Sequence, residues 1–151
     1  MMVNVNVNTG QPIYELIAIL EDEKKGYLHA AERIKDEVLS VLLEKFGYER
    51  GRYIAELRQL ATRFNIRPST DEFTLSLLHR TWMDMKTTFR SGQEAVIKAC
   101  IKGEENSLMN YSKAIEKIPD NDEVKSVLEN QAACIKKVLK RIKEYAAIPF
   151  K

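Results

Sequence analysis

The sequence predicts an all-α protein, a four-helix bundle with one long helical crossover between its two hairpins. Three observations predict this fold. Apolar residues recur at helical spacing through most of the chain. The links between the four long helices are short, then long, then short, and the two hairpins are similar in sequence. The chain has 151 residues, 44% of them hydrophobic, which is enough for one domain with its own core.

The first hairpin is expected to follow a flexible arm, residues 1–12, in which Val and Asn alternate. Apolar spacing predicts its helices at about residues 13–35 and 37–64, and the short link makes them antiparallel. Gly47 and Gly51 weaken the second helix and permit a close approach of another backbone. The face expected to be buried on this helix contains Val38, Leu42, Phe46, Leu57, Leu60 and Phe64.

The second half of the chain begins with the expected crossover helix, at about residues 71–90, after the capping box formed by Ser69 and Glu72. A second capping box opens a long helix at about residues 93–117, which Pro119 ends. The last helix is expected at about residues 123–145. The bundle domain therefore spans residues 13–146, and residues 147–151 form a tail.

An internal repeat relates the two hairpins. The pattern YxxAAExIxD at residues 27–36 returns as YxxAIExIxD at residues 111–120, an offset of 84. After two added residues, EVLSVL at 37–42 returns as EVKSVL at 123–128. Duplication of one hairpin is the preferred explanation of these matches, and chance similarity between helical sequences is the alternative. Duplication predicts a pseudo-twofold axis between the two halves of the bundle.

Glu104 interrupts the apolar face of the helix at 93–117. A carboxylate in a buried face is costly unless a partner neutralises it. We expect Arg52 to be this partner, because a guanidinium fits a carboxylate with two parallel hydrogen bonds. Glu49 and Gln131 are expected to complete the polar cluster. The alternative is that Arg52 and Glu104 lie at the edges of the buried faces of their helices and point to water.

Several motifs carry a resemblance to known proteins. They are GYxxAAE at 26–32, Arg52 followed by Glu56 and Leu57, HRxWMDxK at 79–86, and GEE at 103–105 followed by Tyr111. Over residues 13–145 the chain resembles an uncharacterised bacterial family of four-helix-bundle proteins, a domain of unknown function. It resembles the rubrerythrins and bacterioferritins more distantly. The resemblance implies a ferritin-like four-helix bundle.

The same resemblance implies a di-iron site, in which each hairpin gives one bridging Glu and one Glu-x-x-His. Only Glu104 matches. Leu20 stands in its counterpart position, Glu49-x-x-Arg52 replaces one Glu-x-x-His, and Gln131-x-x-Cys134 replaces the other. We therefore expect no metal cofactor. Iron remains the alternative, and a single metal held by Glu49, Glu104 and Cys134 is a further one.

The expected crossover helix carries a second pair of candidate residues, His79 and Trp82. Trp82 is expected to anchor this helix against the bundle, because it shares a helical face with apolar neighbours. His79 is interpreted as a structural residue, with a ligand or acid role as the alternative. Cys100 and Cys134 are expected to be buried free thiols, with a redox pair as the alternative.

Composition excludes several classes of protein. The net charge is only +2, and a basic stretch at 136–143 is better explained as a solvated helix face than as a nucleic-acid site. No run of 18 apolar residues predicts membrane insertion, and no signal peptide is visible. Free thiols favour a cytoplasmic protein.

The leading interpretation is a non-enzymatic helical module, stress-associated or self-associating, and the expected partner class is a second copy of the chain. The alternatives are an iron-dependent oxidase or peroxidase of rubrerythrin type, and a small-molecule or lipid binder with its pocket beside the crossover.

Overall fold

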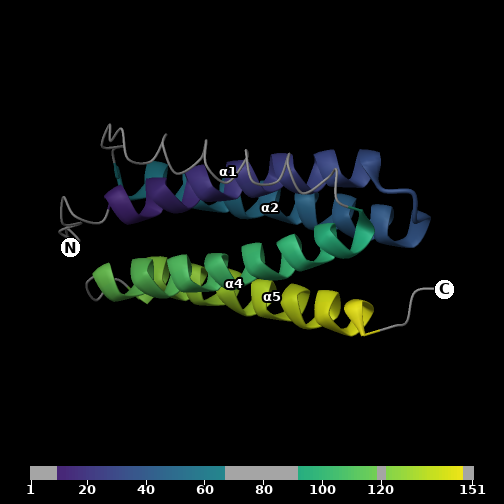
Figure 1. Ribbon diagram of the computed structural model, residues 1–151. Helices are drawn as coiled ribbons and strands as arrows, with labels where there is room; N and C mark the ends of the chain where they lie inside the picture. Colours follow the sequence, from purple (N-terminus) through teal and green to yellow (C-terminus); the bar gives the residue numbers. More distant parts are fainter. Residues whose placement is uncertain (1–9, 67–91, 119–121, 148–151) are drawn as a thin grey trace.

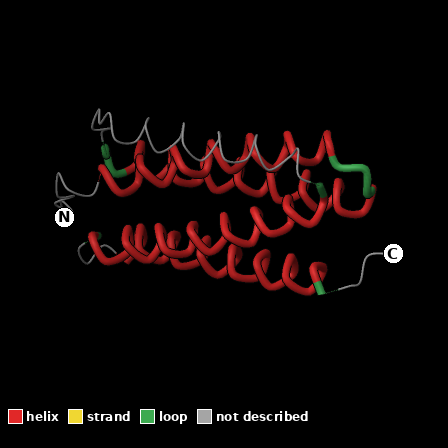
Figure 2. Tube along the Cα trace, viewed as in Figure 1, coloured by secondary structure: helices red, strands yellow, loops and turns green. Residues whose placement is uncertain are grey.

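The computed structural model describes residues 10–66, 92–118 and 122–147. These residues form four long helices: α1 (Gly10–Arg33), α2 (Glu37–Arg63), α4 (Gln93–Lys117) and α5 (Asp122–Ala146). Helices α1 and α2 form one layer, and α4 and α5 form the other (Figure 1). Within the three described segments there is no strand (Figure 2). The predicted all-α four-helix bundle is therefore confirmed.

Helices α2 and α4 run in the same direction (Figure 1). Asp36 is the N-cap of α2 and accepts a hydrogen bond from the N–H of Leu39 at 3.0 Å. Gln93, the first residue of α4, donates from Nε2 to the same carboxylate at 3.3 Å. Both helices thus begin at one end of the bundle, as the short-long-short linkage predicted. An up-down-up-down bundle would place these two starts at opposite ends.

The ends of the helices differ little from the predicted positions, with one exception. Helix α1 starts at Gly10, so residues 10–12 belong to the bundle and not to the expected arm. Pro12 is buried in the first turn. A proline is harmless there, because the first N–H groups of a helix have no partner within the helix.

Over the first turns of α2 the buried face differs from the predicted one, whereas Phe46, Leu57 and Leu60 are buried as predicted. Leu39 and Leu43 are buried, whereas Val38 is 64% exposed and the side chain of Leu42 is half-buried. The sequence has adjacent apolar pairs, Val38-Leu39 and Leu42-Leu43, so spacing alone permits either member of each pair to face the core. Packing against α1 selects the second member.

Buried side chains form two apolar clusters along the bundle. One contains Ile13, Leu20, Leu57 and Tyr111, and the other contains Tyr27, Phe46, Ile97 and Ile142. Between them lie the buried Arg50 and Glu104. The core is therefore divided by a polar layer, and this layer is the main feature of functional interest.

Gly47 and Gly51 offer a test of how closely α1 and α2 approach. A Cβ at residue 47 would lie 2.8 Å from Cδ2 of Leu28, whereas one at residue 51 would meet Lys24 at an ordinary 3.5 Å. Gly51→Ala is expected to raise the free energy of unfolding by about 1 kcal/mol, because alanine is the better helix former. Gly47→Ala is expected to lower it by about 1 kcal/mol through overpacking. Urea unfolding followed by circular dichroism measures both. Equal effects of the two substitutions would contradict a close approach at Gly47.

Candidate functional site

The polar layer is centred on Arg50 of α2, which is fully buried. Its Nη2 donates to Oε1 of Glu104 on α4, and the hydroxyl of Tyr27 on α1 donates to the same oxygen. Its Nε lies 3.6 Å from Oε1 of Glu23 on α1. Ser107 of α4 donates to the other oxygen of Glu23. Three helices therefore bring two carboxylates to one guanidinium.

Helical spacing explains why Arg50 faces the core. Phe46 and Ile54, four residues before and after it, are both buried. Arg52 is exposed, because it lies about 200° around the helix from Arg50. Glu104 is buried and ion-paired, but the prediction that Arg52 is its partner is wrong. The error arises at the start of α2. A buried face that includes Val38 would place residue 52 near the core, but Leu39 is buried there and Val38 is exposed.

Two tyrosine rings flank the buried cation. The guanidinium carbon of Arg50 lies 5.5 Å from the ring centroid of Tyr27 and 5.8 Å from that of Tyr53. An aromatic face attracts a cation, and more strongly when water is excluded. The rings therefore offset part of the cost of burying the charge, in addition to the two carboxylates.

Four atoms of the layer have no hydrogen-bond partner among the described parts of the chain. They are Nε and Nη1 of Arg50, Oε1 of Glu23 and Oε2 of Glu104. Glu23 and Glu104 also line a cavity of about 40 Å³ between α1 and α4, together with Asp22, Gly26, Tyr27, Ala99, Cys100 and Gly103. A space of this size holds one or two water molecules, the usual partners of such atoms.

Burial and like charges alter the titration of this layer. Desolvation raises the pKa of Glu23 to about 7; Arg50 opposes the shift and Glu104 adds to it. Desolvation raises the pKa of Asp22 to about 6, against the attraction of Lys25. Burial also raises the pKa of the Cys100 thiol to about 12, so this cysteine is not an activated nucleophile. Glu23 is thus the group of the layer that titrates closest to neutral pH.

The raised pKa of Glu23 predicts a pH dependence of stability. Its ordinary pKa is 4.5, so between about pH 4.5 and 7 the folded state retains a proton that the unfolded state has lost. The free energy of unfolding is therefore expected to fall as pH rises through this range, and Asp22 adds to the effect. Urea titrations across the range measure the slope, and Glu23→Gln should reduce it. An unchanged slope in that variant would show that Glu23 titrates normally.

Gln131 belongs to a separate group of polar contacts. Its Oε1 accepts from the hydroxyl of Tyr111 at 2.6 Å, and its Nε2 donates to Glu56 at 2.8 Å and to the carbonyl of Tyr53 at 3.2 Å. It is buried, but no described contact joins it to Glu104. The expected cluster of Glu49, Arg52, Glu104 and Gln131 is therefore wrong. Glu49 is half-buried on a flank of α2.

The other predicted residues have mixed outcomes. Cys100 is buried and Cys134 is exposed, and both are free thiols. The expected burial of Cys134 is wrong, because Gln131 and Ile135 are the residues of α5 that face the core here. His79 and Trp82 lie outside the described residues.

The side chains present differ from those of the di-iron site that the resemblance implies. No group of three or more His, Cys, Asp or Glu side chains placed to hold a metal occurs in residues 10–66, 92–118 and 122–147. The two carboxylates that converge, Glu23 and Glu104, converge on Arg50, whose guanidinium occupies the space between them. These residues do not fit a di-iron centre of rubrerythrin type.

The residues that spacing did not single out are Glu23, Arg50 and Ser107. Arg50 could have been found from its place midway between Phe46 and Ile54. Glu23 and Ser107 are 84 positions apart, which is the offset of the repeat, and the structure shows that they are in contact. Residues that correspond in two related halves and touch each other lie near the axis relating those halves. This contact therefore supports the predicted pseudo-twofold axis.

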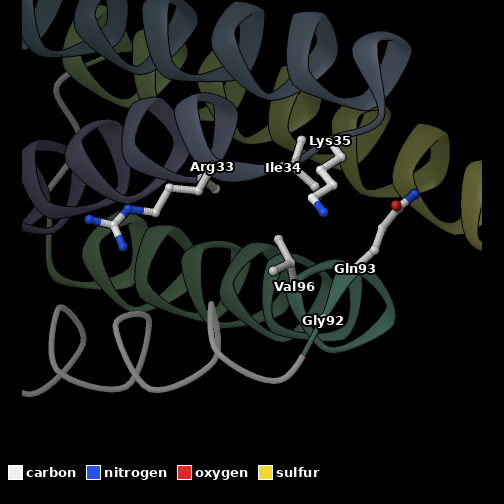
Figure 3. A pocket seen from close by; sticks show the side chains of 7 residues that line it. Arg33, Ile34, Lys35, Gly92, Gln93 and Val96 are labelled. Carbon is white, nitrogen blue, oxygen red and sulfur yellow. The ribbon is translucent and has the colours of Figure 1, made fainter.

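A larger, open pocket lies away from the polar layer, between the end of α1 and the start of α4 (Figure 3). It has a volume of about 270 Å³ and is lined by Ala30, Arg33, Ile34, Lys35, Gly92, Gln93 and Val96. Gly92, the N-cap of α4, has a φ of 97° and makes no side-chain capping bond. The positive φ favours glycine at this entry to the helix.

None of the helices in the described part of the chain is long and apolar enough to span a membrane.

Comparison with known proteins gives one match. No curated protein and no solved structure matches the chain. A family model matches residues 8–117, more than two thirds of the 151 residues. The match spans α1, α2 and α4 with Glu23, Arg50 and Glu104, and it ends before α5. The chain therefore belongs to the family described as "Domain of unknown function (DUF2383)".

Proposed function

We propose that the protein is a non-enzymatic helical bundle of ferritin-like descent, in which an arginine has replaced the metal layer and which acts by association, as a structural or stress-associated module. The observation that carries this proposal is the position of Arg50. Its guanidinium lies between carboxylates from two other helices at the centre of the bundle. In ferritin-like metalloproteins, inward-facing carboxylates of this kind hold the metals.

The chemistry of the layer argues against catalysis. Burial opposes the charge of Arg50, but the combined effect of its neighbours, led by Glu23 and Glu104, raises its pKa above the ordinary value, so it remains a cation and cannot donate a proton. Burial, with the Glu104 charge, raises the pKa of Tyr27 well above its ordinary value. The adjoining cavity, at about 40 Å³, is too small for a lipid or for most metabolites. The buried layer is thus better suited to fixing the helices than to turning over a substrate.

One observation favours the alternative of an iron-dependent oxidase or peroxidase, with a ligand set that differs from that of rubrerythrin. Glu23 has a pKa of about 7, and it shares the small cavity with Asp22 and Glu104. A carboxylate that titrates near neutrality is a candidate general base. The cavity would accept a reactant as small as hydrogen peroxide, so the oxidase or peroxidase remains the second candidate.

Metal analysis separates the two candidates. The full chain is purified without chelator, incubated with ferrous iron under anaerobic conditions, desalted and analysed for metal. We expect far less than one metal per chain. Binding of about two irons per chain, the stoichiometry of a di-iron site, would overturn the proposal. Loss of that iron in Glu104→Gln would then identify the polar layer as the metal site.

A further inference from the structure

The outer face of α2 carries exposed apolar side chains. Four large hydrophobic residues are strongly exposed in the described part of the chain, and three of them lie on this helix: Val38, Val41 and Tyr48, at 64%, 66% and 58%. Val41 and Tyr48 are seven residues apart, or about two turns, so they lie on one line along the helix. Their face points away from the core, because Leu43, Phe46 and Arg50 face inward.

The charges along this outer face are separated by sign. Glu37 and Glu44 occupy its first half, and Lys45 and Arg52 its second half, and all four are exposed. None of the four has an ion-pair partner within the described segments. The acidic residues alternate with Val41 and the basic residues with Tyr48, so the face consists of an acidic half and a basic half with one large apolar residue in each.

We propose that this face is the contact surface for a second copy of the chain, with the two α2 helices antiparallel about a twofold axis between residues 44 and 45. In that register Glu44 of each copy lies opposite Lys45 of the other. Val41 lies opposite Tyr48, and Glu37 lies opposite Arg52. Each pairing occurs twice by symmetry, so the dimer has four opposite-charge pairs around two apolar contacts.

The charge pattern indicates that the partner is a second copy of the chain and that the two α2 helices are antiparallel. A twofold interface brings one surface patch against itself, so the patch must be self-complementary. A parallel arrangement of the two helices would place Glu44 against Glu44 and Lys45 against Lys45. The antiparallel arrangement converts every like pair into an opposite pair. Because the contact uses one helix face per copy, it belongs to the smaller class of interfaces, and a reversible dimer is expected.

This inference rests on the proposed function, since it names the partner of a module that acts by association. Its test is independent of the metal analysis. A failure to dimerise removes only this inference, and binding of iron removes only the non-enzymatic assignment.

The test exchanges charges on the full-length chain. One variant, Glu37→Lys with Glu44→Lys, makes the face basic. The other, Lys45→Glu with Arg52→Glu, makes it acidic. In a dimer of either variant, every charge pair consists of two like charges. The dissociation constant of the dimer, measured by sedimentation, is therefore expected to rise at least about tenfold. An equimolar mixture restores all four opposite-charge pairs and should form a heterodimer.

Two controls accompany the exchange. Met109→Lys replaces the fourth strongly exposed apolar residue, which lies on α4, and should leave dimerisation unchanged. Circular dichroism establishes that each variant is folded. Three results would overturn the proposal: a monomeric wild-type chain at all concentrations, as expected if other residues of the same chain cover the face; dimers of either variant as stable as those of the wild type; or no heterodimer in the mixture.

Discussion

Arg50→Ala is expected to lower the free energy of unfolding by about 3–5 kcal/mol, because it leaves Glu104 buried without a cation. The side chain of Glu104 is 1% exposed, and a water molecule in the adjoining cavity would supply no compensating charge. Tyr27 would remain as a donor to the carboxylate, but a hydroxyl supplies no compensating charge.

Arg52→Ala is the matched control for this prediction. Arg52 is exposed on the opposite face of the same helix, so at concentrations where the chain is monomeric its removal should change the free energy of unfolding by no more than about 0.5 kcal/mol. Urea unfolding followed by circular dichroism measures both variants at one pH. A similar small effect of the two substitutions would mean that the Arg50 layer contributes no more than a surface residue.

Glu104→Leu is expected to have the second large effect, also about 3–5 kcal/mol, because Arg50 would keep only Glu23 as a partner. The raised pKa of Glu23 means that this carboxyl is partly protonated near neutral pH and neutralises Arg50 only incompletely. The loss should therefore be larger at pH 5 to 6 than above pH 8, where Glu23 is ionised.

The double variant Arg50→Met with Glu104→Leu is expected to recover most of the stability lost in Arg50→Met alone or in Glu104→Leu alone. Buried ion pairs replaced together by apolar residues of similar volume are often neutral or more stable. A double-mutant cycle gives the coupling energy directly. If the two single effects simply add, Arg50 and Glu104 do not act as a pair, and the interpretation of the polar layer is wrong.

The periodicity of apolar residues was sufficient to predict the four described helices and the burial of Glu104. The apolar periodicity alone placed the start of α4, because the N-cap of this helix is Gly92, which makes no side-chain capping bond, and not the expected Ser91. Helix α4 was expected at residues 93–117 and is found there. The shared direction of α2 and α4 followed from the lengths of the links, because a short link forces neighbouring helices to be antiparallel.

Glu23 gave no signal in the sequence, since it lies in the charged run from Glu21 to Lys25, which is typical of a solvated face. Its burial depends on Ser107 and Arg50, which come from α4 and α2. The sequence also did not show that Gln131 bonds to Tyr111 and not to Glu104. Both outcomes depend on how the helices rotate against one another.

By itself, therefore, the sequence determined that this protein is an α-helical bundle with a carboxylate in its core. Only the tertiary structure decided that Arg50, and not Arg52, neutralises that carboxylate. The physical reason is that the apolar pairs at the start of α2 allow more than one rotation of the helix about its axis. Packing against α1, with Gly47 close to Leu28, selects one of these rotations, and the selected rotation places Arg50 in the core and Val41 and Tyr48 on the surface.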